Sequence, residues 1–558
     1  MLMNLSQIKQ HFADIKENPK YHLLLIDMKD KYEQIGTDIP ALTFNDYKRV
    51  YEDGDRKTYE AAYFRRREQL NINAVMCLIY PDNSLYSQRL QSIIWEVCNE
   101  YYWGLPYHVE FDKNESSFID LFAAETACAL AEIQWLLKDR LYPHINSRIT
   151  AELDRRVFDS FEHRDFWWFD AVHNWSAVCG GNVAVAMMRA RPELYRKLKP
   201  RFDRIMNSFL SGYDEDGMCK EGVDYWYYGF GSFLFYADML HEFSDGRYNY
   251  FDDCKVREIA GFKNKVMLGN TCCVSFSDSY VRTFDDLAMH VLLHRRYPEI
   301  KSTILPEKAY IRHRTWLYYF RMFIYYDSIN TVPHDNEMNE EVLYTTGSDQ
   351  YIKRSKKYSF AVKAGNNDEP HNHNDIASFI IAYNDNQILA DIGVGLYTRQ
   401  YFDNNTRYSI FCNSSYGHSV PIVCGKPQSA GKQFKGSLTV YDNKVKVDYA
   451  KAYDLPDLTR MQRFFELGDN SVVLHDEFDI REVRERFVSF YKFNLLKPGL
   501  IDVNGVMLTY NHDIWDCKFK EEKHVDNNID KSTVYICDFT TKQNCDNEGY
   551  FNLNILFS

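Results

Sequence analysis

Apolar positions in the first part of the chain recur every three or four residues, which is the spacing of one helix face. The pattern is clearest over residues 117–137, where Ala, Leu and Glu, all good helix formers, predominate. Residues 175–190, 223–242 and 283–296 carry the same pattern. Few strand signals interrupt these segments. The first ~330 residues are therefore predicted to form stacked helical hairpins, as in an α/α toroid.

Beyond about residue 330 the pattern changes to short apolar runs separated by turn residues. Paired runs flank short turns made of Asn, Asp and Gly, which is typical of β-hairpins. The predicted hairpins comprise residues 377–383 with 387–391, residues 438–441 with 444–449, and residues 501–503 with 506–510. Many hairpins without intervening helices predict antiparallel sheets packed as a β-sandwich.

A polar segment around Pro333 separates the two patterns and is predicted to be a linker. The chain has 558 residues, enough for two or three domains with separate cores. We therefore expect an α+β multidomain protein with an N-terminal (α/α) toroid over residues 1–335. A C-terminal antiparallel β-sandwich is expected over residues 336–558.

Composition narrows the classes of ligand. The formal net charge is -13, whereas nucleic-acid binding needs a basic surface, so no nucleic-acid partner is expected. A short anionic ligand held by a few local Arg or Lys side chains is compatible with this charge. Aromatic residues make up 16% of the chain, and they suit both core packing and contact with sugar rings.

The N-terminal residues indicate a cellular location. Charges begin at Lys9, and no uninterrupted apolar segment typical of a secretory signal precedes or follows it. No stretch reaches the ~20 apolar residues needed to cross a membrane. The 13 cysteines form no CxxC pair, which favours reduced, buried thiols. We expect a cytoplasmic protein without a membrane partner.

Two clusters in the helical region could carry chemistry. His173, Asn174 and Trp175 precede a Gly/Ala-rich helix, and donors at a helix N-terminus suit a carboxylate. The alternative is an ordinary Asn cap beside a surface histidine. The second cluster, residues 221–229, holds four consecutive aromatic residues, which cannot all enter one core from one helix. A tyrosine there could transfer protons, or the cluster could pack between helices.

A third cluster precedes a predicted strand in the C-terminal region. His371 and His373 lie two residues apart, so on extended backbone they face the same side. With Asp391 after the hairpin and His418 downstream, a His/Asp/His set suits Zn²⁺. No GxGxxG, GxxxxGK[ST] or GxSxG motif occurs, so no organic cofactor and no serine-hydrolase site are predicted. The acidic pair Asp214 and Asp216 is turn-like, which disfavours a glycosidase pair.

These clusters, in this order, resemble the heparinase II/III-like polysaccharide lyase superfamily. The matching motifs are HNWSAVCGG at 173–181, EGVDYWYYG at 221–229, HNHND with DIGVGLY at 371–397, and RYSIFCNSSYGHSVP from Arg407. The resemblance extends from about Trp103 to Arg463 and implies an α/α toroid joined to an antiparallel β-sandwich. The last loop has GHSVP where many relatives have HNT, so the alignment of His418 departs from the family pattern.

The resemblance also implies residue roles. Asn174, with His173, would neutralise a substrate carboxylate. Tyr228 would be the catalytic tyrosine, with Tyr225 as the alternative, and His371 the catalytic histidine. Substrate contacts would come from Trp175, Tyr225, Tyr408, Arg407 and Trp103, and one structural zinc from His373, Asp391 and His418. Arg460 and Arg463 are further candidates for carboxylate or sulfate contacts, with solvated surface arginines as the alternative.

The resemblance predicts cleavage of uronic-acid-containing oligosaccharides by β-elimination. Neutralising the uronate carboxylate acidifies the C5 proton, which Tyr228 or His371 takes while Tyr228 protonates the departing oxygen. Glycosaminoglycan fragments are the substrate class that we expect first, and oligoalginate is the class that we expect second. A glycoside hydrolase and a non-catalytic protein that binds acidic sugars are the alternatives, and homo-oligomerisation is left open.

Overall fold

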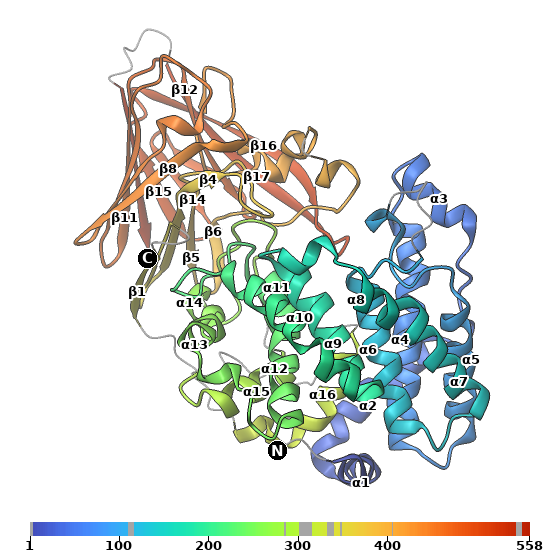
Figure 1. Cartoon of the computed structure of the whole chain (residues 1–558). Coiled ribbons are helices and arrows are strands. Elements are labelled where there is room, and N and C mark those ends of the chain that lie inside the picture. The colour runs from blue at the N-terminus through green and yellow to red at the C-terminus, as the bar shows by residue number, and fades with distance from the viewer. Residues whose placement is uncertain are drawn as a thin grey trace. The chain divides into compact units, whose positions relative to one another are not determined.

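The computed structural model describes residues 4–109, 116–283, 286–300, 315–331, 340–345, 349–403, 405–542 and 549–557. Helices occupy the first part of the chain and strands the last part (Figure 1). Pro333 and the predicted domain boundary lie outside the described residues.

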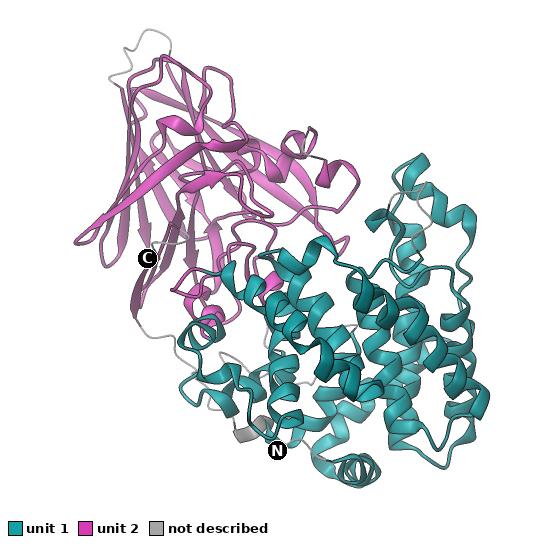
Figure 2. Cartoon of the chain, viewed as in Figure 1, with its two compact units in different colours: residues 1–213, 227–260, 285–334 teal, residues 214–226, 261–284, 335–558 magenta. Residues whose placement is uncertain are grey.

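The chain forms two compact units, each built from several segments (Figure 2). Unit 1 comprises Met1–Tyr213, Tyr227–Ala260 and Asp285–His334. Unit 2 comprises Asp214–Trp226, Gly261–Phe284 and Asp335–Ser558. This division differs from the predicted one, because two segments that precede residue 335 belong to the unit that holds the sheets.

Unit 1 is helical, and small residues set the packing at its centre. Helix α6 (Leu121–Leu137) begins after Asp120, whose Oδ1 accepts the Ala123 N–H at 2.7 Å. It packs against α9 (Asn174–Ala190), which also contacts α10 (Pro192–Ser211) and α12 (Gly231–Phe243). Other helices are α1 (Leu5–Ile15), α2 (His22–Ile35), α3 (Phe44–Glu52), α4 (Lys57–Ile79), α5 (Ser84–Asn99), α7 (Pro143–Leu153), α8 (Asp159–His163), α13 (Cys254–Ala260), α15 (Leu287–Arg296) and α16 (Trp316–Tyr325).

The four predicted helices are confirmed, with one difference in geometry. The segment predicted as a helix over residues 223–242 starts as α11 (Val223–Tyr225) and continues as a π-helical turn over Trp226–Phe230. Only then does α12 begin. A π-helical turn inside a helix is rare and is often found at functional sites. Residues 284–285 of the fourth predicted helix lie outside the described part of the chain.

Unit 2 contains antiparallel sheets. Their strand orders are β1-β2-β3-β5-β6, β13-β14-β15-β18-β11-β10-β9-β8-β4 and β16-β17-β12-β7. The bounds are β1 Glu341–Thr345, β2 Gln350–Arg354, β3 Ser359–Lys363, β4 Gly365–Asn367, β5 Phe379–Tyr383, β6 Asn386–Leu389, β7 Ile422–Val423, β8 Gly431–Tyr441, β9 Lys444–Asp448, β10 Met461–Leu467, β11 Ser471–Phe478, β12 Val483–Ser489, β13 Asn494–Lys497, β14 Leu500–Val503, β15 Val506–Tyr510, β16 Trp515–Val525, β17 Lys531–Thr541 and β18 Tyr550–Phe557. Burial alternates along β10 and β11, so one face of their sheet packs on a core and the other does not.

The three predicted hairpins are confirmed as β5–β6, β8–β9 and β14–β15. In the last, Val503 pairs with Val506 across Asn504 and Gly505, whose φ angles are 50° and 86°. Positive φ at both positions is the requirement of a type I′ turn, which explains why Asn-Gly marks it.

Two further expectations concern membrane-spanning segments and thiols. Among the described residues, no helix combines the length and the apolar character that crossing a membrane requires. The described cysteines are free thiols, and most are buried.

Candidate active-site residues

In unit 1, the backbone next to Tyr228 closely approaches Asn174. Asn174 is the first residue of α9 and is 3% exposed. Tyr228 lies on the π-helical turn and is followed by Gly229. A Cβ on Gly229 would lie 3.0 Å from Asn174 Cβ and 3.1 Å from Asn174 Cα. Glycine at this position therefore lets the turn contact the N-terminus of α9.

Tyr228 donates its hydroxyl hydrogen bond to Glu125 Oε1 over 2.8 Å. Glu125 lies on α6, the helix that packs against α9. Burial, and then the Glu125 carboxylate, raise the pKa of Tyr228 well above its ordinary value. Tyr228 is therefore a neutral phenol at physiological pH. Glu125 was not among the predicted residues, although it lies among small apolar residues of α6, where a buried carboxylate needs a partner.

An aromatic platform lies beside Asn174 and consists of Trp167, Trp175, His173 and His108. The Trp167 ring lies 4.8 Å from that of Trp175 and 5.9 Å from that of His173. His108 contacts Trp175 edge to face at 4.8 Å, and its Nδ1 lies 2.7 Å from Asp120 Oδ2. Trp167 is 55% exposed. Flat, partly exposed rings next to a helix N-terminus suit a sugar ring that carries a carboxylate.

Trp103, by contrast, is a core residue. It is 1% exposed, and its Nε1 donates to the Val97 carbonyl at 2.8 Å. The Arg156 guanidinium lies 5.1 Å from the ring centre. This placement does not support the predicted sugar contact of Trp103, because the ring has no surface to offer.

In unit 2, His371 is held by Asp278. His371 Nδ1 lies 2.7 Å from Asp278 Oδ2, and a carboxylate can only accept, so Nδ1 carries the proton. The other ring nitrogen, Nε2, lies 3.6 Å from Glu221 Oε1, which is beyond hydrogen-bond distance, and it carries the lone pair of this tautomer. The Tyr225 ring stacks on His371 at 4.2 Å, and the Tyr225 hydroxyl lies 2.8 Å from that of Tyr397. This geometry is that of a histidine oriented to act as a general base.

Asp278 also organises the residues around His371. This fully buried carboxylate accepts hydrogen bonds from His371, His373, Tyr401 and Arg407. Burial alone would raise its pKa, but Arg407 and the two histidines hold the pKa well below its usual range. Asp278 was not among the predicted residues. The available signal was the segment Ser275–Ser279, which has no helical pattern although it lies in the helical region.

The predicted metal ligands lie together in unit 2. His373, Asp391 and His418 are buried, and one ligand atom from each lies within 4.8 Å of the others. His373 Nε2 contacts Asp278 Oδ1 at 3.0 Å, and His418 Nε2 contacts the Cys412 carbonyl at 2.8 Å. Both contacts place the proton on Nε2, which leaves Nδ1 as the ligand atom. His418 Nδ1 lies 3.0 Å from Asp391, and His373 Nδ1 is buried without a hydrogen-bond partner.

The arginines and the tyrosine predicted to contact substrate differ in burial. Arg407 is buried, and its guanidinium bonds to Asp278 and to the Asn372 carbonyl, so it is not free for a substrate anion. Tyr408 is partly exposed and donates to Asn372 Oδ1 at 2.9 Å. Arg463 is fully buried against Asp476 and Glu485, which is inconsistent with the predicted sulfate contact. Arg460 is exposed, 3.8 Å from Glu477.

The helical segment that contains Tyr225 and Tyr228 is shared between the two units. Tyr225 belongs to unit 2 and Tyr228 to unit 1, because the boundary passes between Trp226 and Tyr227. Three positions along the chain separate the two tyrosines.

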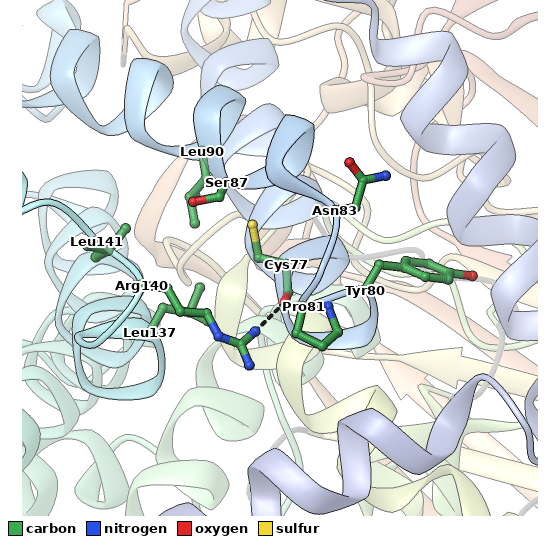
Figure 3. Close-up of a pocket in the computed structure, with 9 residues that line it drawn as sticks. All are labelled: Cys77, Tyr80, Pro81, Asn83, Ser87, Leu90, Leu137, Arg140 and Leu141. Atoms are coloured by element: carbon green, nitrogen blue, oxygen red, sulfur yellow. Dashed lines mark hydrogen bonds between the residues drawn. The ribbon is translucent and has the colours of Figure 1, made fainter.

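A separate small pocket of unit 1 holds none of the predicted site residues (Figure 3). In it, Arg140 donates to the Cys77 carbonyl at 2.8 Å. Its lining consists of Cys77, Tyr80, Pro81, Asn83, Ser87, Leu90, Leu137, Arg140 and Leu141.

The chain is similar in fold to several solved polysaccharide lyases. It matches a mutant of heparan sulfate lyase HepC from Pedobacter heparinus with a TM-score of 0.60 and 12% identity, over 99% of this chain and 87% of that one. A heparinase III matches with a TM-score of 0.60 and 11% identity, over 100% and 85%. Chondroitin AC lyase of Streptomyces coelicolor A3 matches with a TM-score of 0.57 and 11% identity, over 99% of this chain and 82% of that one. No protein-family model and no curated protein matches the sequence.

These similarities confirm the predicted fold, an α/α toroid followed by an antiparallel β-sandwich. They also confirm, at the level of fold, the predicted resemblance to polysaccharide lyases of this type. Identities of 10–13% show similarity of fold alone, because one fold can carry different chemistries.

Proposed function

We propose that this protein is a polysaccharide lyase that cleaves uronic-acid-containing oligosaccharides by β-elimination. The observation that carries the proposal is the close approach of Gly229, the residue after Tyr228, to Asn174. It joins a carboxylate-binding position to a proton-transfer group inside a fold that solved lyases share.

Asn174 is suited to neutralise the substrate carboxylate. Its amide group can donate hydrogen bonds, and the N-terminus of α9 adds partial positive charge. His173 precedes it and can contribute a second donor. Donors aimed at the carboxylate stabilise the negative charge that develops when the C5 proton leaves, and such a donor is worth about 10²–10³-fold in rate.

Two groups can move protons in this proposal. Tyr228 is a neutral phenol and can protonate the departing 4-oxygen, while His371 presents a lone pair on Nε2. The orientation of the C5 proton relative to the leaving group, syn or anti, decides which of them acts as base. Elimination needs no attacking water, so no pair of carboxylates across the sugar is required.

His373, Asp391 and His418 fit one zinc ion. The fit rests on two imidazoles whose Nδ1 atoms are the ligand positions, and on the buried His373 Nδ1 that lacks another partner. When bound, zinc would hold the loops that carry His373 and His418 without contacting the sugar. Asp278 then orients a ligand, His373, and a catalytic residue, His371, with one carboxylate.

The proposed substrate class is glycosaminoglycan-type oligosaccharides, because the similar structures are named heparan sulfate lyase, heparinase III and chondroitin AC lyase. Oligoalginate contains the same reacting group and is the second substrate class. The aromatic platform supplies stacking surface for either.

The test is ultraviolet absorbance of the C4–C5 unsaturated product on hyaluronan, chondroitin, heparan and alginate oligosaccharides. Wild type should raise the absorbance on at least one, and Tyr228→Phe and Asn174→Ala should each lose about 10²-fold or more. His475→Ala, which changes a histidine on β11 of the sandwich, is the control and should retain activity. Reducing ends that accumulate without ultraviolet absorbance would instead indicate a hydrolase.

A further inference from the structure

We infer that Glu125 is a positioning residue that accepts the hydroxyl proton of Tyr228 and thereby makes this tyrosine the base of the elimination. The inference rests on the proposed function and adds a residue to its mechanism. It follows from two contacts of the π-helical turn: the Tyr228 hydroxyl contacts Glu125 of α6, and the adjacent Gly229 contacts Asn174 at the N-terminus of α9.

The hydrogen bond between these residues has a direction. A carboxylate can only accept, so the 2.8 Å contact between Tyr228 Oη and Glu125 Oε1 uses the tyrosine proton. The phenol oxygen then has its lone pairs available for a proton from elsewhere. In the resting state Tyr228 is therefore arranged to receive a proton before it gives one.

The surroundings make an unassisted tyrosinate scarce. Burial and the carboxylate both raise the pKa of Tyr228, so deprotonation in advance is unfavourable at neutral pH. Transfer of the hydroxyl proton to Glu125 at the moment of reaction avoids a free phenolate. A nucleophilic serine and its histidine use the same principle of an adjacent base.

The proton balance closes with the residues of this chain. The C5–H bond breaks, its proton moves to Tyr228 Oη, and the original hydroxyl proton moves to Glu125. The C5 electron pair forms the C4=C5 double bond as the C4–O bond breaks. Tyr228 then gives its proton to the leaving oxygen, and Glu125 returns a proton to Tyr228, which restores the resting state.

The first readout needs no substrate. Ionisation of Tyr228 is followed as tyrosinate absorbance in wild type, Glu125→Gln and Tyr228→Phe, the last to identify the signal. Glutamine keeps an accepting oxygen but removes the charge, so the midpoint for Tyr228 should fall in Glu125→Gln. Glu96→Gln, which removes a charge from an exposed position on α5, is the matched control and should not change it.

The second readout is catalysis. In Glu125→Gln, kcat should fall by about 10²-fold or more while KM changes little, and added formate should partly restore kcat of Glu125→Ala but not of Tyr228→Phe. Wild-type kcat in Glu125→Gln, or an unchanged Tyr228 midpoint, would overturn the inference. If wild type cleaves nothing, the proposed function fails and the base role fails with it. In that case the pH midpoint of Tyr228 ionisation tests only whether the Glu125 charge affects Tyr228.

Discussion

Asp278 and Glu125 show that the proposed site depends on carboxylates that control other side chains. Each lies far along the chain from the residue it controls: 93 positions separate Asp278 from His371, and 103 separate Glu125 from Tyr228. The histidines, tyrosine and asparagine could be predicted because they occur in short motifs. Their carboxylate partners could not, because a distant partner leaves no local spacing to recognise.

Replacement of Asp278 by Asn tests whether His371 must be oriented by this carboxylate in order to act, because His371 itself is left in place. The change leaves the buried Arg407 cation without its partner, which costs about 3–5 kcal/mol of folding free energy. It also replaces an acceptor-only carboxylate by an amide that can donate as well as accept, so the proton of His371 is no longer fixed on Nδ1, and we expect kcat to fall by on the order of 10²-fold or more. Thermal unfolding and initial rates check both effects.

Asp385→Asn is the matched control for this prediction. The Asp385 carboxylate accepts the N–H groups of Thr271 and Cys272 at 3.0 and 2.9 Å in the same unit. Its loss should lower stability but leave kcat close to wild type. A kcat of Asp278→Asn within about twofold of wild type would show that His371 does not need the carboxylate.

Asp224 gives a prediction for pH. It accepts the Tyr280 N–H at 3.0 Å, and burial raises its pKa to about 6. Between the ordinary Asp value of about 3.9 and this pKa, the folded state binds more protons, so stability falls as pH rises and is constant above. Asp224→Asn keeps an acceptor and cannot ionise. Its advantage in stability should be ~1 kcal/mol at about pH 4.5 and reach ~3 kcal/mol at pH 7.5, as measured by thermal unfolding. An advantage that does not change with pH would contradict the raised pKa.

Among the elements, the N-terminus of α9 carries both Asn174 and part of the aromatic platform. Trp167→Ala should raise KM by up to about tenfold with little change in kcat, because stacking contributes ~0.5–1.5 kcal/mol and 1.4 kcal/mol is tenfold. Trp95→Ala is the control, since Trp95 is also exposed, at 46%, but belongs to α5. Equal KM values for wild type and Trp167→Ala would exclude Trp167 from substrate binding.

The elements themselves were largely predictable, for identifiable reasons. Helices α6 and α15 begin at Asp120 and Asp286, whose side chains accept backbone N–H groups, and the β14–β15 turn needs positive φ at Asn504 and Gly505. The π-helical turn was not predictable, because its aromatic residues fit an α-helix equally well. The contact that requires Gly229 comes from α9, about 55 residues earlier in the chain.

For the whole molecule, the proposed zinc site at His373, Asp391 and His418 predicts that stability depends on zinc. Removal of zinc by a chelator should lower the Tm of the transition that involves unit 2 by about 5–10 °C, because a ligand at 100 times its Kd adds ~2.7 kcal/mol. His373→Ala should have a low Tm that the chelator does not change, whereas His475→Ala should respond like wild type. Protein purified without any bound metal, with a Tm insensitive to added zinc, would contradict the proposal.

The arrangement of the units was the part least accessible to sequence analysis. A single boundary near residue 335 was expected from the change of pattern, yet Asp214–Trp226 and Gly261–Phe284 belong to unit 2. Both segments contain few strand signals, and their membership depends on tertiary contacts such as Asp278 with Arg407 and Thr271 with Asp385. Hydrophobic periodicity reports the type of an element and carries no information about its distant neighbours.

The interleaved segments impose an order on biosynthesis. Asp278 leaves the ribosome 93 residues before His371 and 129 before Arg407. At about 5–20 residues per second, its buried charge waits roughly 6–26 s for the arginine that neutralises it. During that interval the segment around Asp278 must stay hydrated, so unit 2 cannot close as the chain emerges. A nascent chain stalled before Arg407 should therefore be exposed to proteases and chaperones at this segment, even when the first helices have already folded.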